Sequence, residues 1–287
     1  MPLLHERLAE ARKTLRGAGI DLEEATIDVE VLARHVLRWD RGQLLTRARD
    51  PVPAGFDPAF HLLIARRAAR EPIAYIVGTR EFWNLDFEVT PDVLIPRPET
   101  ELLIEEAIEC ARRRLDVSCA IDVGTGSGCI AVAIAVEFPT ARVVATDTSA
   151  AALDVARRNA RRHGVGGRIE FVQTDVLEGV TRTAGLILSN PPYIPTTDAA
   201  GLQPEVARFE PAEALFAGPD GLDVVRRLLA EAPARLTEDG LLAVEFGFGQ
   251  EPQVRALAAE TGWTVVRVRA DLQSIPRVAV LRPLRGA

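Results

Sequence analysis

The sequence predicts an α/β protein with a mostly parallel sheet, preceded by a small all-helical domain. Short apolar segments alternate with helical segments from residue 118 onward, which is typical of a parallel sheet with helical crossovers. A glycine-rich loop follows the first of these strands, at a place where such sheets bind ligands. Residues 1–77 show only helical periodicity, and 287 residues suffice for two domains.

The composition is that of an ordinary globular protein, with 47% hydrophobic and 26% charged residues. The net charge of −7 and the pI of about 5.3 disfavour a nucleic-acid-binding protein, which normally has a basic domain. The N-terminus is too charged for a signal peptide, and no apolar run is long enough to span a membrane. Three cysteines at unhelpful spacings indicate reduced thiols in a cytoplasmic protein without a metal site.

The N-terminal domain is expected to contain helices over residues 3–16 and 26–37, followed by a short helical piece around Leu44. The first of these helices has one apolar face, formed by Leu4, Leu8, Ala11 and Leu15. A further helix is expected to start at Asp57, which would cap it, with Pro58 in the first turn.

Residues 78–98 are predicted to form a β-hairpin that joins the helical domain to the domain of residues 99–287. The segment 82–89 alternates at period two near its end, as a strand does, and residues 90–92 contain a turn signal. Residues 93–95 would form the second strand. Pro98 and the acidic residues after it then suit the start of a helix that ends near Arg114.

The C-terminal domain is predicted from alternating strands and helices. Strands are expected at residues 119–123, 143–146, 169–173, in the segment that enters Asn190, and at 241–246, 263–268 and 278–281. Helices are expected at residues 129–137, 150–163, 222–235 and 250–261.

The first strand leads into a loop with a glycine at every second position. Three such glycines allow a sharp turn and the close approach of a ligand to the main chain. The fingerprint of dinucleotide-binding loops places its last small residue one position later, where this chain has Cys129. The spacing therefore favours an adenosyl ligand without a pyrophosphate. The candidate cofactor-binding residues of the loop are Gly124, Thr125, Gly126, Ser127 and Gly128.

Acidic residues end the next two strands. Asp147 follows Gly124 by about 20 residues, the distance at which an acid binds ribose hydroxyls in related folds; it could equally cap the helix after Ser149. Asp175 is placed to accept a hydrogen bond from an adenine amine, and Val176 to pack on the ring. A loop acid without a role is the alternative for Asp175.

The fourth strand stops at Asn190, Pro191, Pro192 and Tyr193, and these are the candidate catalytic residues. Prolines end a strand and stiffen the corner after it. The Asn190 side chain and the neighbouring proline carbonyl supply two acceptors, which suit a planar NH2 group, and Tyr193 could pack on that group. The pattern predicts methylation of a carboxamide or a base amine by S-adenosyl-L-methionine, with alignment supplying much of the rate.

The glycine loop, the acid after the second strand and the Asn-Pro-Pro-Tyr motif resemble the class I S-adenosylmethionine-dependent methyltransferases, which have a Rossmann-like fold. The chain more closely resembles the HemK/PrmC family, the peptide chain release factor N5-glutamine methyltransferases. This resemblance also rests on residues 78–83, 94–101, 122–130, 190–194, 209–215 and 218–222.

The resemblance implies methyl transfer to the glutamine of the Gly-Gly-Gln motif in class 1 peptide chain release factors, with the helical domain engaging the substrate. It implies a seven-stranded sheet whose last strand is antiparallel. It places Asn190–Tyr193 in the substrate motif and Gly124–Gly128, Asp147 and Asn190 at the cofactor. Arg97 would lie near the cofactor or form a structural ion pair.

Three alternatives remain open on the sequence. A related enzyme methylates a glutamine of a ribosomal protein. A DNA adenine N6-methyltransferase would use the Asn-Pro-Pro-Tyr motif in the same way, to hold the NH2 group of adenine, although the net negative charge of the chain disfavours DNA binding. A non-catalytic nucleotide-binding scaffold is the third. One departure from the family is Ser274, which stands where glycine is common and puts the late turn in doubt.

Overall fold

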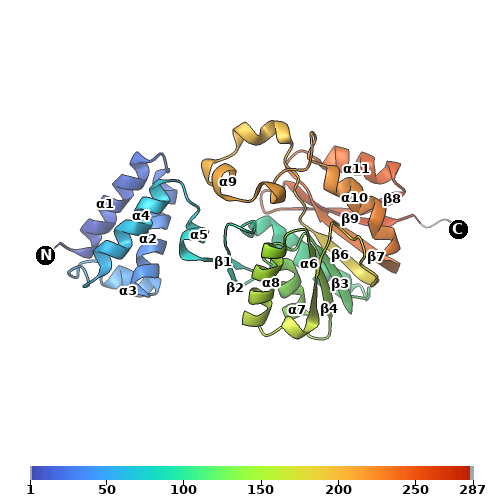
Figure 1. The fold of residues 1–287 in the computed structure, drawn as a ribbon, viewed down its shortest axis with the longest axis horizontal. Coiled ribbons are helices and arrows are strands. Elements are labelled where there is room, and N and C mark those ends of the chain that lie inside the picture. Colours follow the sequence, from blue (N-terminus) through green and yellow to red (C-terminus); the bar gives the residue numbers. More distant parts are fainter. Residues whose placement is uncertain (1, 285–287) are drawn as a thin grey trace. The chain divides into compact units, whose positions relative to one another are not determined.

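The computed structural model describes residues 2–284, which form two compact units. The first contains the chain up to Thr79 together with Gln203–Phe209, and the second contains Arg80–Leu202 and the chain from Glu210 onward. The N-terminal helices and the sheet are shown in Figure 1. Among residues 2–284, the longest apolar helical stretches fall short of what a membrane crossing requires.

The first unit is helical, as the sequence predicts. Its helices are α1 (Leu4–Gly17), α2 (Leu22–Leu37), α3 (Arg41–Thr46), α4 (Phe56–Ala68), α5 (Ile73–Val77) and α9 (Pro204–Phe209). The buried faces of α1, α2 and α4 meet around Leu4, Leu32 and the stacked rings of Phe56 and Phe60. Helix α2 starts four residues before the predicted point because the Asp21 side chain accepts hydrogen bonds from two main-chain N–H groups of its first turn.

The prediction that Asp57 caps α4 is wrong. The helix begins at Phe56, and its N-cap is Gly55, which lies in the left-handed region at φ 79°. Asp57 therefore falls in the first turn, where it pairs with Arg7 at 3.2 Å. Pro58 still lies in that turn, where no N–H is needed from it.

Arg67 of α4 is the centre of a buried ion cluster in the helical unit. Only 2% of this arginine is exposed. Its Nε donates to Asp28 Oδ2 at 2.6 Å, its Nη1 to Glu205 Oε1 at 2.8 Å and its Nη2 to Glu24 Oε1 at 2.6 Å. Glu205 lies on α9, so the cluster ties a segment distant in sequence to the N-terminal helices.

The hairpin exists, but earlier in the chain than the sequence suggests. It consists of β1 (Thr79–Phe82) and β2 (Leu85–Glu88), and residues 93–95 form no strand. The turn residues Trp83 and Asn84 lie at φ 54° and 55°, the left-handed pair typical of a two-residue hairpin turn. Prolines at positions 91, 96 and 98 flank the segment 93–95, and a proline has no N–H to donate to a neighbouring strand.

The second unit contains a seven-stranded sheet in the order β5-β4-β3-β6-β7-β9-β8. Its strands are β3 (Cys119–Val123), β4 (Arg142–Asp147), β5 (Ile169–Gln173), β6 (Ala184–Ser189), β7 (Leu236–Glu245), β8 (Trp263–Ala270) and β9 (Pro276–Pro283). The strands from β5 to β7 are parallel, and β9 runs antiparallel to both of its neighbours. The predicted fold class is therefore confirmed, including the antiparallel last strand.

Helices cover both faces of the sheet (Figure 1). They are α6 (Glu101–Arg112), α7 (Cys129–Glu137), α8 (Ala150–Arg162), α10 (Asp223–Glu231) and α11 (Glu251–Glu260), joined in part by short 3-10 turns at η1 (Pro98–Thr100), η2 (Gly166–Arg168), η3 (Thr196–Gly201), η4 (Ala212–Ala214) and η5 (Ala232–Ala234). Successive β6 residues enter different cores: Leu188 packs with α6 and α7, and Ile187 with α10 and α11. A strand buried on both faces explains why its sequence is a continuous apolar run.

The turn between β8 and β9 forms despite Ser274. Asp271 Oδ1 accepts hydrogen bonds from the N–H groups of Gln273 and Ile275, at 2.9 and 3.0 Å, and fixes the turn. Ser274 lies at φ 63°, in the region that favours glycine.

We expect Ser274→Gly to raise the free energy of unfolding by about 0.5–1 kcal/mol. Relief of the left-handed strain outweighs the extra backbone entropy that glycine loses on folding. Urea denaturation measures the difference, and Ser274→Ala is the control, since it keeps the Cβ atom and should bring no gain. A glycine variant no more stable than the parent would contradict this account.

Candidate active site

The carboxyl ends of β3, β4 and β6 bring the predicted motifs to one edge of the sheet. Val123 at the end of β3 pairs in register with Thr146 on one side and with Ser189 on the other. The Ser189 hydroxyl also donates to the Val123 carbonyl at 2.8 Å. The chain leaves β3 toward β4 and returns to β6 on the opposite side, and such a switch point is where open α/β sheets bind ligands.

A cavity of about 720 Å³ lies at this edge. Its wall includes eight of the thirteen predicted site residues, namely Gly124, Gly126, Asp147, Asp175, Val176, Asn190, Pro191 and Pro192. The other five, Thr125, Ser127, Gly128, Tyr193 and Arg97, are outside the lining. The cavity also meets the segment 91–94 and Phe216, which the sequence did not identify as parts of the site.

The three loop glycines are needed for two different reasons. All have positive φ, at 73° for Gly124, 53° for Gly126 and 81° for Gly128. A Cβ atom on Gly124 or Gly126 would meet nothing within 4 Å, so these two leave open space beside the main chain where the cavity lies. A Cβ atom on Gly128 would lie 2.9 Å from that of Ala156, so this glycine allows α7 and α8 to pack closely.

Asp122 holds the glycine loop through hydrogen bonds to Thr125 and to the first turn of α7. Its Oδ2 accepts from the Thr125 hydroxyl at 2.6 Å and from the Ala131 N–H of α7 at 3.0 Å. Burial raises the pKa of this carboxyl to about 7, although both hydrogen bonds oppose the shift. Thr125 and Ser127 are 3% and 2% exposed and lie outside the cavity lining, so contact of either with the cofactor stays a prediction.

Asp147 both orders the loop and lines the cavity. Its Oδ2 accepts from the Gly126 N–H and its Oδ1 from the Ser149 N–H, each at 2.9 Å. A carboxylate offers about four lone-pair sites, so these bonds leave capacity for ribose hydroxyls. Asp147 does not cap α8, because the N-cap is Ser149, whose hydroxyl accepts from the Ala152 N–H at 3.1 Å. The bonds that Asp147 makes to Gly126 and Ser149 are compatible with the predicted binding role.

Asp175 and Val176 lie on the wall beside Asp147, in a strained turn. Val176 has φ 51°, an outlier for a β-branched residue, and strain of this kind gathers at ligand sites. Asp175 Oδ2 pairs with Arg227 Nη1 at 2.6 Å. This ion pair leaves Oδ1 available to a ligand amine.

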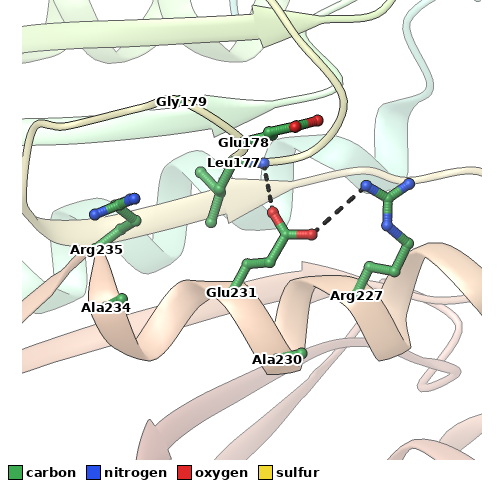
Figure 2. Close-up of a pocket in the computed structure, with 8 residues that line it drawn as sticks. All are labelled: Leu177, Glu178, Gly179, Arg227, Ala230, Glu231, Ala234 and Arg235. Atoms are coloured by element: carbon green, nitrogen blue, oxygen red, sulfur yellow. Dashed lines mark hydrogen bonds and ion pairs between the residues drawn. The ribbon is translucent and has the colours of Figure 1, made fainter.

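A smaller cavity of about 430 Å³ lies where α10 supports this turn. Figure 2 shows Glu231 reaching from α10 to the Leu177 N–H, which donates to it at 3.0 Å, and toward Arg227 at 3.5 Å. Arg227 thus joins Glu231 to Asp175. Glu231 and Arg227 are therefore engaged in holding the turn that carries Asp175 and Val176.

Asn190 presents an acceptor that has no partner. Its Nδ2 donates to Thr100 Oγ1 at 2.9 Å. Its Oδ1 is buried and accepts no hydrogen bond from any residue in the described part of the chain. Buried acceptors are rarely left unpaired in proteins, so this atom on a cavity-lining residue is suited to a donor that enters with the substrate.

Thr100 and Glu245 extend the network behind Asn190. The Thr100 hydroxyl donates to Glu245 Oε2 at 2.8 Å, and the Tyr193 hydroxyl reaches Glu245 Oε1 at 3.5 Å. Sequence reasoning missed both residues as parts of the site. The available signals were the position of Thr100 in a family-specific segment and an acid at the end of an apolar strand.

The Tyr193 carbonyl is bonded to Gln250, which the sequence did not identify, and lies close to Gly221 of the 218–222 segment. Gln250 Nε2 donates to the Tyr193 carbonyl at 3.0 Å. A Cβ atom on Gly221 would lie 2.2 Å from the same oxygen, which explains the glycine in the 218–222 segment. The corner after Pro192 is thereby fixed from two sides.

Arg97 forms an ion pair, which was one of its two expected roles. Its Nη2 donates to Glu210 Oε1 at 2.6 Å, so the 94–101 and 209–215 segments are bonded to each other. Burial raises the pKa of Glu210, and Arg97 opposes that shift. Contact between Arg97 and the cofactor stays a prediction.

Comparisons with known proteins follow the two-part organisation of the chain. The family described as "PrmC N-terminal domain" matches residues 6–78, and "Methyltransferase small domain" matches residues 99–203. A release factor glutamine methyltransferase of Burkholderia pseudomallei is 44% identical over 279 residues, covering 94% of this chain and 95% of that protein. One of Geobacter sulfurreducens is 43% identical over 258 residues, covering 90% and 89%.

Solved structures with similar folds are methyltransferases of low sequence identity. The catalytic domain of hMettl16, a human protein, in complex with MAT2A 3′UTR hairpin 6 matches with a TM-score of 0.57 and 17% identity, over 78% of this chain and 82% of that one. A methyltransferase from Pyrococcus furiosus matches with a TM-score of 0.50 and 19% identity, over 78% and 97%. At these identities the likeness concerns the fold alone.

Proposed function

The chain belongs to the release factor glutamine methyltransferase family, and from that premise we propose that it methylates the glutamine of the Gly-Gly-Gln motif in class 1 peptide chain release factors. The methyl donor is S-adenosylmethionine. The observation that carries the proposal is the Oδ1 atom of the cavity-lining residue Asn190, which is buried and accepts no hydrogen bond within residues 2–284. A side-chain amide has the NH2 group that such an acceptor would bind.

The cavity residues fit S-adenosylmethionine. The open space beside Gly124 and Gly126 admits a ligand to the main chain. Asp147 would hold the ribose hydroxyls, Asp175 the adenine amine, and Val176 the ring face. When bound, the cofactor supplies an electrophilic methyl group on a positively charged sulfur.

The substrate motif orients a poor nucleophile. Asn190 Oδ1 and the Pro191 carbonyl would accept the two hydrogens of the glutamine NH2, which fixes the direction of the nitrogen lone pair. Tyr193 would limit the movement of the amide plane. An amide nitrogen is weakly nucleophilic, so holding it in line with the methyl group supplies much of the rate.

The helical unit would select the release factor. One glutamine is too small a feature to distinguish a protein, and a standard interface buries about 800 Å² on each partner. The helical unit exposes four large apolar side chains that could contribute to such a surface, Leu22, Ile27, Leu45 and Leu62. We place the protein in the cytoplasm, where its three free cysteines would stay reduced.

Mass spectrometry of purified release factor, after incubation with the enzyme and S-adenosylmethionine, tests this function. We expect one methyl group on the glutamine of the Gly-Gly-Gln peptide and none on a release factor whose motif glutamine is replaced. A short Gly-Gly-Gln peptide should react far more slowly than the intact factor. Methylation of ribosomal protein or of adenine in DNA, with none on the release factor, would overturn the proposal.

Asp147→Ala is expected to weaken S-adenosylmethionine binding by about 1.5–3 kcal/mol, the contribution of hydrogen bonds to a charged group. Titration calorimetry measures the affinity. Asp154→Ala is the matched control, because it removes the same charge from a side chain that is 65% exposed. An unchanged affinity in Asp147→Ala would restrict Asp147 to its bonds with Gly126 and Ser149.

A further inference from the structure

A buried chain of hydrogen bonds ends at the Asn190 amide. It runs from Asn190 Nδ2 to Thr100 Oγ1 at 2.9 Å and from Thr100 Oγ1 to Glu245 Oε2 at 2.8 Å. Thr100 is 1% exposed and Glu245 2% exposed, so water does not compete for these groups. Asn190 directly follows β6, Thr100 is the last residue of η1 before α6, and Glu245 is the last residue of β7.

While Glu245 is ionised, the number of available hydrogens fixes the direction of these hydrogen bonds. An ionised carboxylate can only accept, so the single hydrogen of the Thr100 hydroxyl points to Glu245. The Thr100 oxygen is then left as an acceptor and takes a hydrogen from the Asn190 NH2. The Asn190 oxygen must occupy the other position of the amide, where it has no protein partner in residues 2–284.

We propose that Thr100 and Glu245 are positioning residues that present the oxygen of Asn190, rather than its nitrogen, to the substrate amide. The inference deepens the proposed function and rests on it. Neither residue needs to touch the substrate or the cofactor. Their role is to select one of the two orientations of the Asn190 side-chain amide. Its C=O and NH2 ends are nearly equal in shape, but one accepts and the other donates hydrogen bonds.

Protonation of Glu245 would allow the opposite arrangement. A protonated carboxyl can donate to Thr100, whose own hydrogen is then free to point at Asn190, which would favour the flipped amide. The flipped amide would turn its NH2 toward the substrate NH2, and two donors cannot bond each other.

The surroundings of Glu245 set the pH at which this would occur. Burial raises the pKa of the Glu245 carboxyl to about 7, and the hydrogen bond from Thr100 lowers it. The charge of Glu99 adds to the rise, whereas Arg277 and the Tyr193 hydroxyl oppose it. Below about pH 7, the Asn190 side chain is therefore expected to lose the orientation in which its oxygen faces the substrate amide.

Thr100→Val and Thr100→Ser form the first test. Valine keeps the shape but removes the acceptor of the Asn190 NH2, so kcat should fall by roughly 10–100-fold, as for outer partners that orient metal ligands. The KM for S-adenosylmethionine should change little. Serine restores the hydroxyl and should recover most of the loss. Equal kcat in the parent and the valine variant would overturn the proposal.

The pH dependence of kcat gives a readout that a purely structural role would not move. The parent should lose activity as the pH falls through about 7, as Glu245 takes up a proton. The Glu245→Gln variant has no carboxyl group at this position, so its kcat should not fall as the pH drops through this range. If kcat of Glu245→Gln fell with pH as it does in the parent, another group would be responsible for the fall, and the inference would be contradicted.

Nuclear magnetic resonance of the unmodified protein tests the network without any turnover. The Asn190 side-chain NH2 signals, identified by their loss in Asn190→Ala, should be protected from exchange above pH 7 and should shift as the pH falls through it. Absence of both effects would overturn the proposal even if Thr100→Val failed to fold. If the parent does not methylate release factor but the titration occurs, the proposed function fails and the positioning network stands.

Discussion

Asn190→Ala is expected to lower kcat roughly 10²–10³-fold while S-adenosylmethionine affinity falls much less. The variant removes the acceptor that holds one hydrogen of the substrate NH2, and loss of one preorganised hydrogen bond of this type costs about 2.7–4 kcal/mol in the transition state. The structure supports the large effect because Asn190 Oδ1 is buried and accepts no hydrogen bond from any group among residues 2–284. Single-turnover kinetics at saturating cofactor measures the step.

Tyr193→Phe is the matched control for Asn190→Ala. It keeps the aromatic ring in the same motif and removes only a hydroxyl whose bond to Glu245 is long, at 3.5 Å. The loss of kcat should therefore be small beside that of Asn190→Ala. Near-parental turnover in Asn190→Ala, or an equal loss in both variants, would show that the asparagine does not hold the amide.

The sheet and the cofactor loop could be predicted because their signals are local. Apolar runs such as β6, bounded by turn residues, identify strands directly. The glycine spacing determines the loop after β3, where all three glycines have the positive φ that the pattern implies. The hairpin was misplaced because its turn uses Trp83 and Asn84 in left-handed conformations, without the glycine that usually signals them.

The network behind Asn190 could not be predicted, because its members are distant in the chain. Thr100 bonds Asn190 across 90 residues and Glu245 across 145. No periodicity or spacing relates such positions, and only the sheet order brings β7 beside β6. The same applies to Glu205, which meets Arg67 across 138 residues and belongs to the helical unit although the chain around it belongs to the other.

Arg67→Met is expected to lower the free energy of unfolding of the helical unit by about 3–5 kcal/mol, the cost of removing one partner from a buried ion pair. Methionine replaces the aliphatic part of the side chain but leaves Asp28 and Glu205 without their shared guanidinium. Burial already raises the pKa of Asp28 against the pull of Arg67. Burial also favours a raised pKa at Glu205, yet the hydrogen bonds from Arg67 and Arg70 prevail and lower it. Without Arg67, Asp28 must stay charged without its ion-pair partner or take up a proton, whereas Glu205 keeps Arg70 at 2.8 Å.

Urea denaturation followed by circular dichroism measures this loss, with Arg49→Met as the control. Arg49 is exposed, and surface substitutions of this kind usually change stability by less than about 0.5 kcal/mol. Adding Asp28→Asn to Arg67→Met should recover part of the loss, because the charge that lost its ion-pair partner is then removed. If Arg67→Met unfolded at the same urea concentration as Arg49→Met, the cluster would contribute nothing to the stability of the helical unit. Recovery in the double variant would instead show that the penalty arises from the unpaired Asp28 carboxylate and not from the lost arginine packing.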